Sequence, residues 1–241
     1  MVQNERPRRQ YRQVADQIQA LVAARKLGPG QRLPSERELA EMLSVSRPSL
    51  REALIALDVE GHVEIRMGSG IYVGSTAGPR AEGDTPRPDA EGPLELLRAR
   101  CVIESAIAEE AAAHATPRSV ARLDDNLREM AACLDDTAQA IRLDGAFHIE
   151  VASATGNAVL AKLTAETFHK RMSPYFAQFS AYFENPRTWR LALEEHGTVR
   201  DAIAAADPPA ARDAMRHHLT EAGRRFIDGV LAERAEESAA T

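Results

Sequence analysis

The amino-terminal part of the chain contains apolar residues at helical spacing. In the first such stretch they are Tyr11, Val14, Ile18, Leu21 and Val22. The pattern ends near Gly28-Pro29-Gly30, where two glycines and a proline break a helix. The chain is therefore expected to begin with an amphipathic helix.

Two further helices are predicted from their start signals. Ser35 followed by Glu38 forms a capping box, which opens a short helix. After the tight connection Ser44-Val45-Ser46, the hydroxyl of Ser46 can cap a third helix. Pro48 then falls in the first turn, where its missing N–H costs nothing, and the helix runs to Gly61.

An alternating pattern follows the third helix. Val63 and Ile65 alternate with polar residues, Met67-Gly68-Ser69-Gly70 turns the chain, and Ile71 and Val73 return it. This pattern predicts a β-hairpin. Two short helices joined by a tight turn and followed by a hairpin make a winged helix-turn-helix.

The remainder of the chain has helical periods without convincing strand alternation, and a linker precedes it. Eight of the twenty residues from Gly74 to Pro93 are Gly or Pro, which excludes a regular element there. Helices are expected at about 94–115, 117–135, 138–155, 157–180, 187–206 and 208–234. The predicted fold is therefore mostly α: a winged helix-turn-helix domain (1–74), a linker (75–93), an all-α bundle of about six helices (94–234) and a tail (235–241).

Composition excludes several classes of protein. Of 241 residues, 44% are hydrophobic and 27% are charged, which is typical of a globular protein. No apolar run approaches the roughly 18 residues of a membrane span, and the first residues lack the apolar segment of a secretory signal. Cys101 and Cys133 are too few for a disulfide framework or a cysteine zinc site. We expect a cytoplasmic protein.

Charge and helix position point to a polyanionic partner. The net charge is −6, yet residues 1–74 carry 11 basic against 9 acidic residues, and the remainder carries 19 against 27. The third helix places Arg47 and Arg51 near its amino end, which is the end that a recognition helix presents to base edges and phosphates. A solvated helix face explains two arginines equally well. The two arginines, taken together with the turn, the cap and the wing, favour DNA binding.

Residues 10–74, approximately, resemble the GntR family of bacterial transcription regulators. The motifs that carry the resemblance are Leu33-Pro34-Ser35-Glu36-Arg37-Glu38-Leu39-Ala40, Val45-Ser46-Arg47, Arg51-Glu52-Ala53-Leu54, Glu60-Gly61 and Gly68-x-Gly70. The resemblance implies DNA roles for Arg37, Ser46, Arg47, Ser49 and Arg51, with Gly68 at the wing tip reaching the minor groove. Pro48 stands where relatives often have a small polar residue, so a hydroxyl contact is absent there.

Four residues of the predicted bundle could converge on one ion. Asp144 and His148 are four residues apart and share a helix face. His196 and His218 lie in register with the apolar stripes of their helices, whereas His217 faces water. Imidazole and carboxylate suit Zn, Ni, Mn or Fe. For each histidine taken singly, the alternative is a hydrogen-bonded core residue.

The bundle also resembles the FadR-like branch of GntR proteins, with its metal-binding effector domain of the FCD type. The motifs are Asp144-Gly145-Ala146-Phe147-His148, Gly156-Asn157, Glu195-His196 and Met215-Arg216-His217-His218-Leu219. The resemblance implies that Asp144, His148, His196 and His218 hold a divalent metal, with Zn as the first expectation and Ni, Mn or Fe as alternatives. It also places Arg100 in the effector cavity. The other interpretation of Arg100 is an ion pair with Glu104 on an exposed helix face.

These features predict a transcription regulator, taken as a repressor, that binds double-stranded DNA at a palindromic operator as a homodimer. A divalent metal with one carboxylate and three neutral imidazoles has one net positive charge, so a small carboxylate or hydroxy-acid effector is expected there. Two alternatives stay open: a metal-dependent enzyme acting on a small hydroxy acid, and a metal-free regulator that senses acyl-CoA. No HExxH motif, evident general base or nucleophile motif supports the enzyme.

Overall fold

The structure is a computed structural model that describes residues 10–66, 69–74, 93–172, 176 and 184–237. The chain separates into two compact units, Met1–Pro93 with Gly229–Thr241, and Leu94–Asp228. Within the described ranges, no helix is both long and apolar enough to cross a membrane. The predicted linker lies outside these ranges apart from Pro93, as does the end of the predicted tail, residues 238–241.

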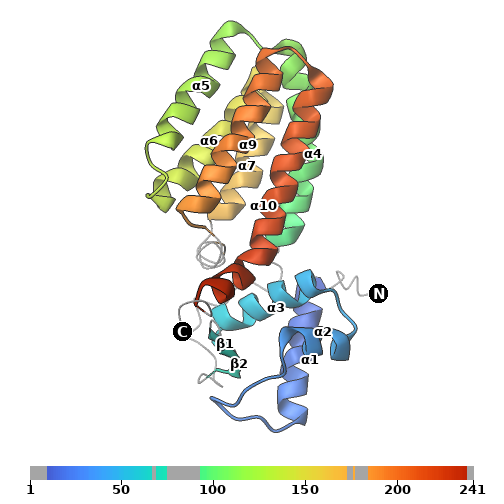
Figure 1. The fold of residues 1–241 in the computed structure, drawn as a ribbon. Coiled ribbons are helices and arrows are strands. Elements are labelled where there is room, and N and C mark those ends of the chain that lie inside the picture. Colours follow the sequence, from blue (N-terminus) through green and yellow to red (C-terminus); the bar gives the residue numbers. More distant parts are fainter. Residues whose placement is uncertain (1–9, 67–68, 75–92, 173–175, 177–183, 238–241) are drawn as a thin grey trace, which may run out of the picture. The chain divides into compact units, whose positions relative to one another are not determined.

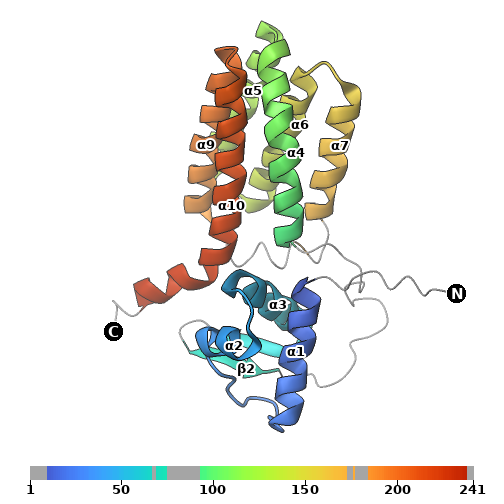
Figure 2. The ribbon, with the colours of Figure 1, turned by 90° about the vertical axis from the view of Figure 1, so that its right-hand side faces the viewer.

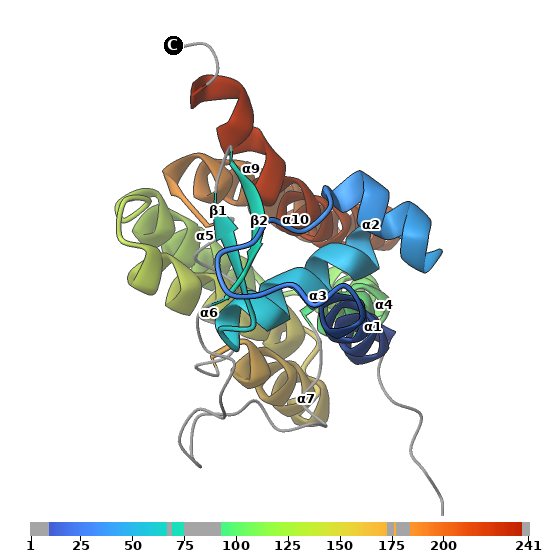
Figure 3. The same cartoon turned by 90° about the horizontal axis from the view of Figure 1, so that it is seen from below.

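The first unit has the predicted helix, helix, helix, hairpin order (Figures 1 and 3). Its elements are α1 (Gln10–Ala24), α2 (Glu36–Leu43), α3 (Arg47–Val59), β1 (Val63–Arg66) and β2 (Gly70–Val73). The central helix α3 contacts α1, α2 and β1. Ile18, Leu39, Leu50 and Leu54 form part of the buried core between them. The predicted winged helix-turn-helix is therefore present.

Local signals fix the start of α2 and of α3. The Ser35 side chain accepts a hydrogen bond from the backbone N–H of Glu38, and the Glu38 carboxylate accepts one from the Ser35 N–H at 2.8 Å. The Ser46 hydroxyl caps α3 by accepting from the Ser49 N–H, and a proline occupies the first turn. Between the two helices, Ser44 adopts a left-handed conformation with φ of 54° and turns the chain. These capping predictions are confirmed.

A third extended segment pairs with the hairpin, and the sequence patterns did not predict it. In the antiparallel hairpin Val63 lies opposite Val73. On the other side of β2, the Gly30 N–H donates to the Val73 carbonyl at 2.8 Å and the Leu33 N–H donates to the Ile71 carbonyl at 2.7 Å. The segment is too short and too rich in glycine and proline to show alternation, so only tertiary pairing reveals it.

The second unit is a bundle of helices (Figure 2). Its elements are α4 (Pro93–His114), α5 (Pro117–Ala131), α6 (Thr137–Ala154), α7 (Ala158–His169), the short 3-10 helix η1 (Lys170–Met172), α9 (Pro186–Ala204) and the part of α10 (Pro208–Glu237) that ends at Asp228. Five of the six expected helices are present with shifted ends. The predicted all-α bundle is confirmed.

The prediction of a single helix over 157–180 is wrong. The α-helix ends at His169, and Lys170–Met172 continue as a tighter 3-10 turn. In this turn the Arg171 guanidinium forms ion pairs with Asp144 of α6 and with Glu184. Apolar periodicity carries no information about such pairs, so the pattern could not show where α7 ends. Residues 173–175 and 177–183 lie outside the described residues.

The core of the second unit surrounds the position of the predicted metal ligands. Phe147, Val199 and Met215 belong to one buried cluster, which joins α6, α9 and α10. Gly145 lets α7 approach α6, because a Cβ at this residue would lie 2.4 Å from Cε1 of Phe168. Asp144 immediately precedes Gly145, so this close packing brings α7 beside the site.

Candidate metal centre and nucleic-acid interface

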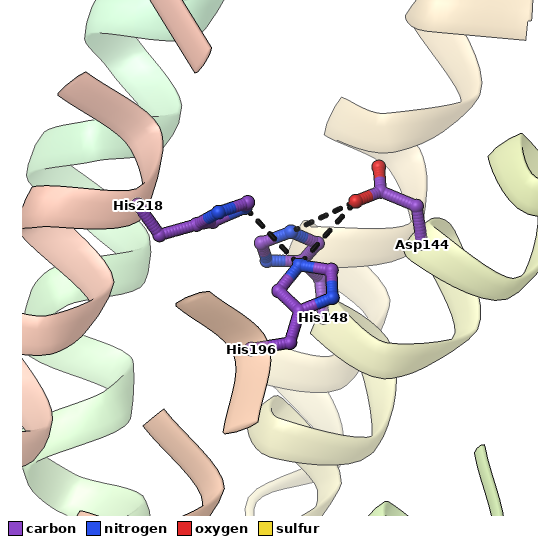
Figure 4. Close-up of side chains that lie close together, drawn as sticks. All are labelled: Asp144, His148, His196 and His218. Carbon is purple, nitrogen blue, oxygen red and sulfur yellow. Dashed lines mark hydrogen bonds and ion pairs between the residues drawn. The ribbon is translucent and has the colours of Figure 1, made fainter. Parts of the chain in front are cut away.

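The four residues predicted as metal ligands meet inside the second unit. Asp144 and His148 come from α6, His196 from α9 and His218 from α10, and none of them is more than 3% exposed. One potential ligand atom from each lies within 4.8 Å of the others. Figure 4 shows the imidazoles and the carboxylate pointing toward one another. The helical register of the sequence thus correctly identified four side chains that lie close together in the folded unit.

The distances in this cluster suit a transition-metal ion. The Nε2 atoms of His196 and His218 are 3.1 Å apart, and Asp144 Oδ1 lies 3.4 Å from His196 Nε2 and 3.7 Å from His148 Nε2. Two ligands of one tetrahedral zinc are separated by roughly 3.3 Å when each bond is about 2.0–2.1 Å. Among the described residues, His148 Nε2 has no hydrogen-bond partner although it is buried. The donor set therefore fits a divalent metal.

Two glutamates contact the far sides of the histidine rings. Glu104 Oε2 of α4 lies 2.5 Å from His148 Nδ1, and Glu195 Oε2 of α9 lies 2.8 Å from His218 Nδ1. Carboxylates in these positions orient metal-binding imidazoles in many proteins, because they hold the Nδ1 proton and leave Nε2 for the metal. The third ring, that of His196, stacks on Phe147 with centroids 4.1 Å apart.

Arginines in turn hold the acidic residues of the cluster. Arg100 donates from Nε to Glu104 at 2.6 Å, and Arg225 donates from both terminal nitrogens to Glu195 at 2.6 and 2.8 Å. Arg171 donates from Nη1 to Asp144 Oδ2 at 2.6 Å, which leaves Oδ1 facing the histidines. Each acidic group that touches the cluster is therefore fixed by a cation.

Sequence reasoning assigned no role to most of these supporting residues. In the sequence patterns Glu104 enters only as a possible ion-pair partner of Arg100 and Glu195 only as the neighbour of His196. Arg171 and Arg225 belong to none of the predicted motifs. Signals were available: Glu104 lies one helical turn after Arg100, and Arg225 lies seven residues after His218 on the same helix. Such spacings are common on any helix, so only the packing of α4, α9 and α10 distinguishes these pairs.

Electrostatics keep three of the four candidate ligands, Asp144, His196 and His218, in the forms that bind metal. Burial opposes ionisation of Asp144, but Arg171 and the nearby imidazoles hold the pKa of its carboxyl well below the usual range. Burial lowers the pKa of His196 well below its usual value and also lowers that of His218. For His148, Glu104 overcomes burial and raises the pKa. A proton would therefore compete with a metal mainly at His148.

A small cavity adjoins the cluster. Its volume is about 50 Å³, and its lining includes Asp144, His218, Arg100, Arg171 and Arg225 together with apolar side chains. The predicted effector residue Arg100 is 2% exposed and pairs with Glu104. The alternative of a pair on an exposed helix face is therefore wrong in one respect, because the pair is present but buried against the cavity.

The predicted DNA-contacting residues divide into exposed and buried groups. Arg37 of α2, the cap residue Ser46 and Arg47 of α3 are exposed. Ser49 is only 6% exposed, and its hydroxyl lies 2.8 Å from that of Ser46. Gly68, predicted at the wing tip, lies outside the described residues.

Arg51 is not the solvated arginine that its sequence position allowed. It is 4% exposed, and its Nε donates to Glu36 of α2 at 2.9 Å. The pair fastens α2 to α3 within the helix-turn-helix. Arg51 therefore stabilises α3 from its buried side, whereas Arg47 lies on the exposed surface of the same helix. Both arginines belong to the predicted set, and tertiary pairing separates them.

Comparison with protein families gives two matches. The model described as the FCD domain matches residues 95–221. The model described as bacterial regulatory proteins, gntR family, matches residues 10–73. Together they span both units of the chain.

Several regulatory proteins are similar to this chain over most of their length. The Uxu operon transcriptional regulator of Escherichia coli K12 is 36% identical over 91% of this chain and 88% of its own. The Exu regulon transcriptional regulator of the same strain is 38% identical over 88% and 83%. The putative L-lactate dehydrogenase operon regulatory protein of that strain is 34% identical over 89% and 85%.

A solved structure shares the fold. A transcriptional regulator described as a GntR family member, from Pseudomonas syringae pv. tomato str. DC3000, matches with a TM-score of 0.50 and 18% identity, covering 95% of this chain and 89% of that one. At this identity the likeness speaks for the fold alone.

Proposed function

Because the chain belongs to the GntR family of bacterial regulatory proteins and carries an FCD domain, we propose that it is a repressor controlled by a small carboxylate at a metal centre. That it is a DNA-binding transcription regulator follows from the family itself. The proposal assigns residues 1–74 to DNA binding, 75–93 to a linker, 94–234 to effector binding and dimerisation, and 235–241 to a tail.

The observation that carries the metal centre is the convergence of Asp144, His148, His196 and His218 in the buried interior of the second unit. Without a cation, the Nε2 atoms of the three buried imidazoles would have, among the described residues, only the Asp144 carboxylate and each other as neighbours for a hydrogen bond. A divalent ion satisfies the lone pairs of all three at once. Zn is the first choice, with Ni, Mn or Fe as alternatives, because the donor set suits each of these ions.

The cavity beside the centre supports a small carboxylate or hydroxy-acid effector. A volume of about 50 Å³ accommodates a few water-sized groups. Arg100 lines this cavity, and a metal held by the cluster would add positive charge beside it. One similar protein is described as a regulator of an L-lactate dehydrogenase operon, and L-lactate has this chemistry.

The exposed part of the helix-turn-helix supports operator contacts by Arg37, Ser46 and Arg47. Ser49 and Arg51 would position these groups, and Gly68 would approach the minor groove. A homodimer follows from affinity, because one recognition helix contacts few base pairs and two-fold pairing doubles them on a palindrome. A similar protein of Edwardsiella tarda is described as an HTH-type transcriptional repressor, which supports the direction of control.

The two alternatives are less well supported. The relatives named above are regulators of transcription rather than enzymes, so the buried cluster serves sensing rather than turnover. A metal-free acyl-CoA sensor would require a large apolar cavity, whereas the cavity at the cluster is small and has three arginines in its lining.

Elemental analysis of the purified protein tests the proposal most directly. About one transition metal per chain is expected in the wild type and none in His218→Ala, since one of four ligands is removed. Operator binding is then measured by fluorescence anisotropy on metal-loaded protein, with and without L-lactate and related hydroxy acids. Failure of the wild type to bind any of the four metals would overturn the metal centre. An operator affinity that no small carboxylate changes would overturn the effector class.

A further inference from the structure

One of the two glutamates behind the histidine rings is held in a complete chain of hydrogen bonds. The His218 Nδ1–H donates to Glu195 Oε2 at 2.8 Å. Arg225 donates from Nη1 to Glu195 Oε1 at 2.6 Å and from Nη2 to Oε2 at 2.8 Å. The side chains of Glu195 and Arg225 are 13% and 15% exposed, so solvent screens this chain little. Both carboxylate oxygens are thereby fixed.

The contact with Glu195 decides which ring nitrogen of His218 carries the proton and which one presents a lone pair to the cluster. Glu195 as a carboxylate can only accept hydrogen bonds, so the contact at Nδ1 requires a proton on that nitrogen. The other nitrogen, Nε2, then presents its lone pair, and it lies 3.1 Å from His196 Nε2 within the proposed centre. The same carboxylate also fixes the plane of the ring, because the side chain of His218 has two rotatable bonds and this contact restrains both.

We propose that Glu195, clamped by Arg225, is the positioning group that prepares His218 as a metal ligand. This inference rests on the proposed metal centre and assigns a role to two residues that touch no ligand atom of the metal themselves. A fixed carboxylate raises the basicity of the imidazole it accepts from, which strengthens a bond from Nε2 to a cation. Loss of the carboxylate leaves the ring free to rotate or to place its proton on Nε2.

The chain Arg100–Glu104–His148 has a similar composition but a different geometry. Glu104 Oε2 lies 2.5 Å from His148 Nδ1, yet this ring nitrogen has no hydrogen bond of normal geometry among the described residues. Arg100 also contacts Glu104 mainly through one strong bond, at 2.6 Å, with a second at 3.4 Å. The hydrogen bonds of Arg225–Glu195–His218 are thus better defined than those of Arg100–Glu104–His148, and the experiment below is directed at them.

The sequence supplies matched controls next to both residues. Glu194 precedes Glu195 on α9 and is exposed, and Arg224 precedes Arg225 on α10 and is exposed, where it pairs with Glu221. Glu194→Gln and Arg224→Gln therefore change net charge in the same way as Glu195→Gln and Arg225→Gln. They leave the hydrogen-bond chain to His218 intact.

The test measures Zn²⁺ affinity of the full chain by competition with a chromophoric chelator, and the absorption spectrum of the Co²⁺-loaded protein. Glu195→Ala is expected to weaken Zn²⁺ binding by about 10–100-fold, the range typical of lost supporting groups. Glu195→Gln keeps a hydrogen-bond acceptor for Nδ1 and is expected to lie between Glu195→Ala and the wild type. Arg225→Gln is expected to weaken binding by less than Glu195→Ala, because His218 keeps its partner.

The outcomes separate this inference from the metal centre itself. A wild type that binds no Zn²⁺ or Co²⁺ overturns both. A wild type that binds metal, together with Glu195→Ala and Glu195→Gln proteins of unchanged affinity and unchanged Co²⁺ spectrum, overturns the positioning role alone. Equal losses in Glu194→Gln and Glu195→Gln would assign the effect to net charge and would also overturn it. If Glu195→Ala does not fold, as judged by circular dichroism of the metal-free protein, Glu195→Gln decides the question.

Discussion

The two candidate functional regions use charged side chains in opposite ways. Arg37 and Arg47 of the helix-turn-helix are exposed, and the elements that present them begin at caps formed within four residues of sequence. Asp144 and His196 in the bundle are 2% and 0% exposed, and their neighbours come from helices far apart in the sequence. The first region is arranged for a partner outside the protein, whereas the second already satisfies most of its charges internally.

This difference has an energetic consequence. Removal of an exposed arginine changes the free energy of unfolding little, so its substitution reports on binding. A buried ionic group depends on its partners, and its removal leaves an uncompensated charge in a medium of low polarity. Substitutions in the helix-turn-helix surface should therefore change DNA affinity alone, while those in the bundle should change ligand affinity and stability together.

The largest expected effect is loss of the metal from the bundle. His148→Ala and His196→Ala should each reduce bound metal from about one ion per chain to near zero, because a buried ligand is lost and no exposed group can replace it. Elemental analysis after dialysis measures this. His217→Ala is the control, since His217 is exposed and adjacent to His218. Metal loss from this control would mean that the wrong histidine of the pair was chosen.

The second largest effect is a difference in stability between variants of the two arginines of α3. Arg51→Ala should lower the free energy of unfolding of the first unit by about 2–3 kcal/mol, because it leaves the Glu36 carboxylate without its partner in a mostly buried position. Chemical denaturation followed by circular dichroism measures the change. Arg47→Ala should not alter stability measurably. Equal stability of both variants would show that the Arg51–Glu36 pair contributes nothing to the unit.

The third effect is on DNA affinity. Arg47→Ala should weaken operator binding by about 1–3 kcal/mol if the guanidinium contacts a guanine. Anisotropy titrations on operator and on unrelated DNA measure affinity and specificity. Arg118→Ala removes the same charge from an exposed position on α5 and serves as the control. An unchanged affinity and specificity of Arg47→Ala would contradict its placement on the recognition surface.

A smaller effect is expected at the start of α2. Ser35→Ala should destabilise the first unit by about 1 kcal/mol, the usual contribution of a helix N-cap. Thermal unfolding measures it. Thr116→Ala removes the equivalent N-cap of α5 in the second unit and should leave the first unit unaffected. A destabilisation well below a few tenths of a kcal/mol would show that the cap is replaceable by water.

The smallest effect is a dependence of stability on pH. The Ser35 hydroxyl and backbone N–H donate to Glu38 and lower the pKa of its carboxyl. A carboxyl with a lowered pKa in the folded state stabilises that state above its ordinary pKa, and this contribution is lost as the pH falls through the lowered value. Glu38→Gln should flatten the stability profile of the first unit in that acidic range. An identical profile in wild type and variant would contradict the contribution.

Much of the architecture was determined by the sequence alone. Short-range signals such as the Ser35–Glu38 box, the Ser46 cap and the alternation around Val63 act within a few residues, so they are visible without knowledge of the fold. Helical register likewise identified which face of each bundle helix turns inward, and it separated His218 from His217. These features depend on local geometry, which the order of residues specifies.

Only the tertiary structure decided what surrounds those inward faces. The end of α7 at His169, the pairing of Gly30–Leu33 with β2 and the burial of Arg51 against Glu36 all depend on contacts between distant segments. The same holds for Arg225 and Glu195 behind His218. Register tells which way a side chain points, but a partner on another helix is determined by how the helices pack, and packing is a property of the whole unit.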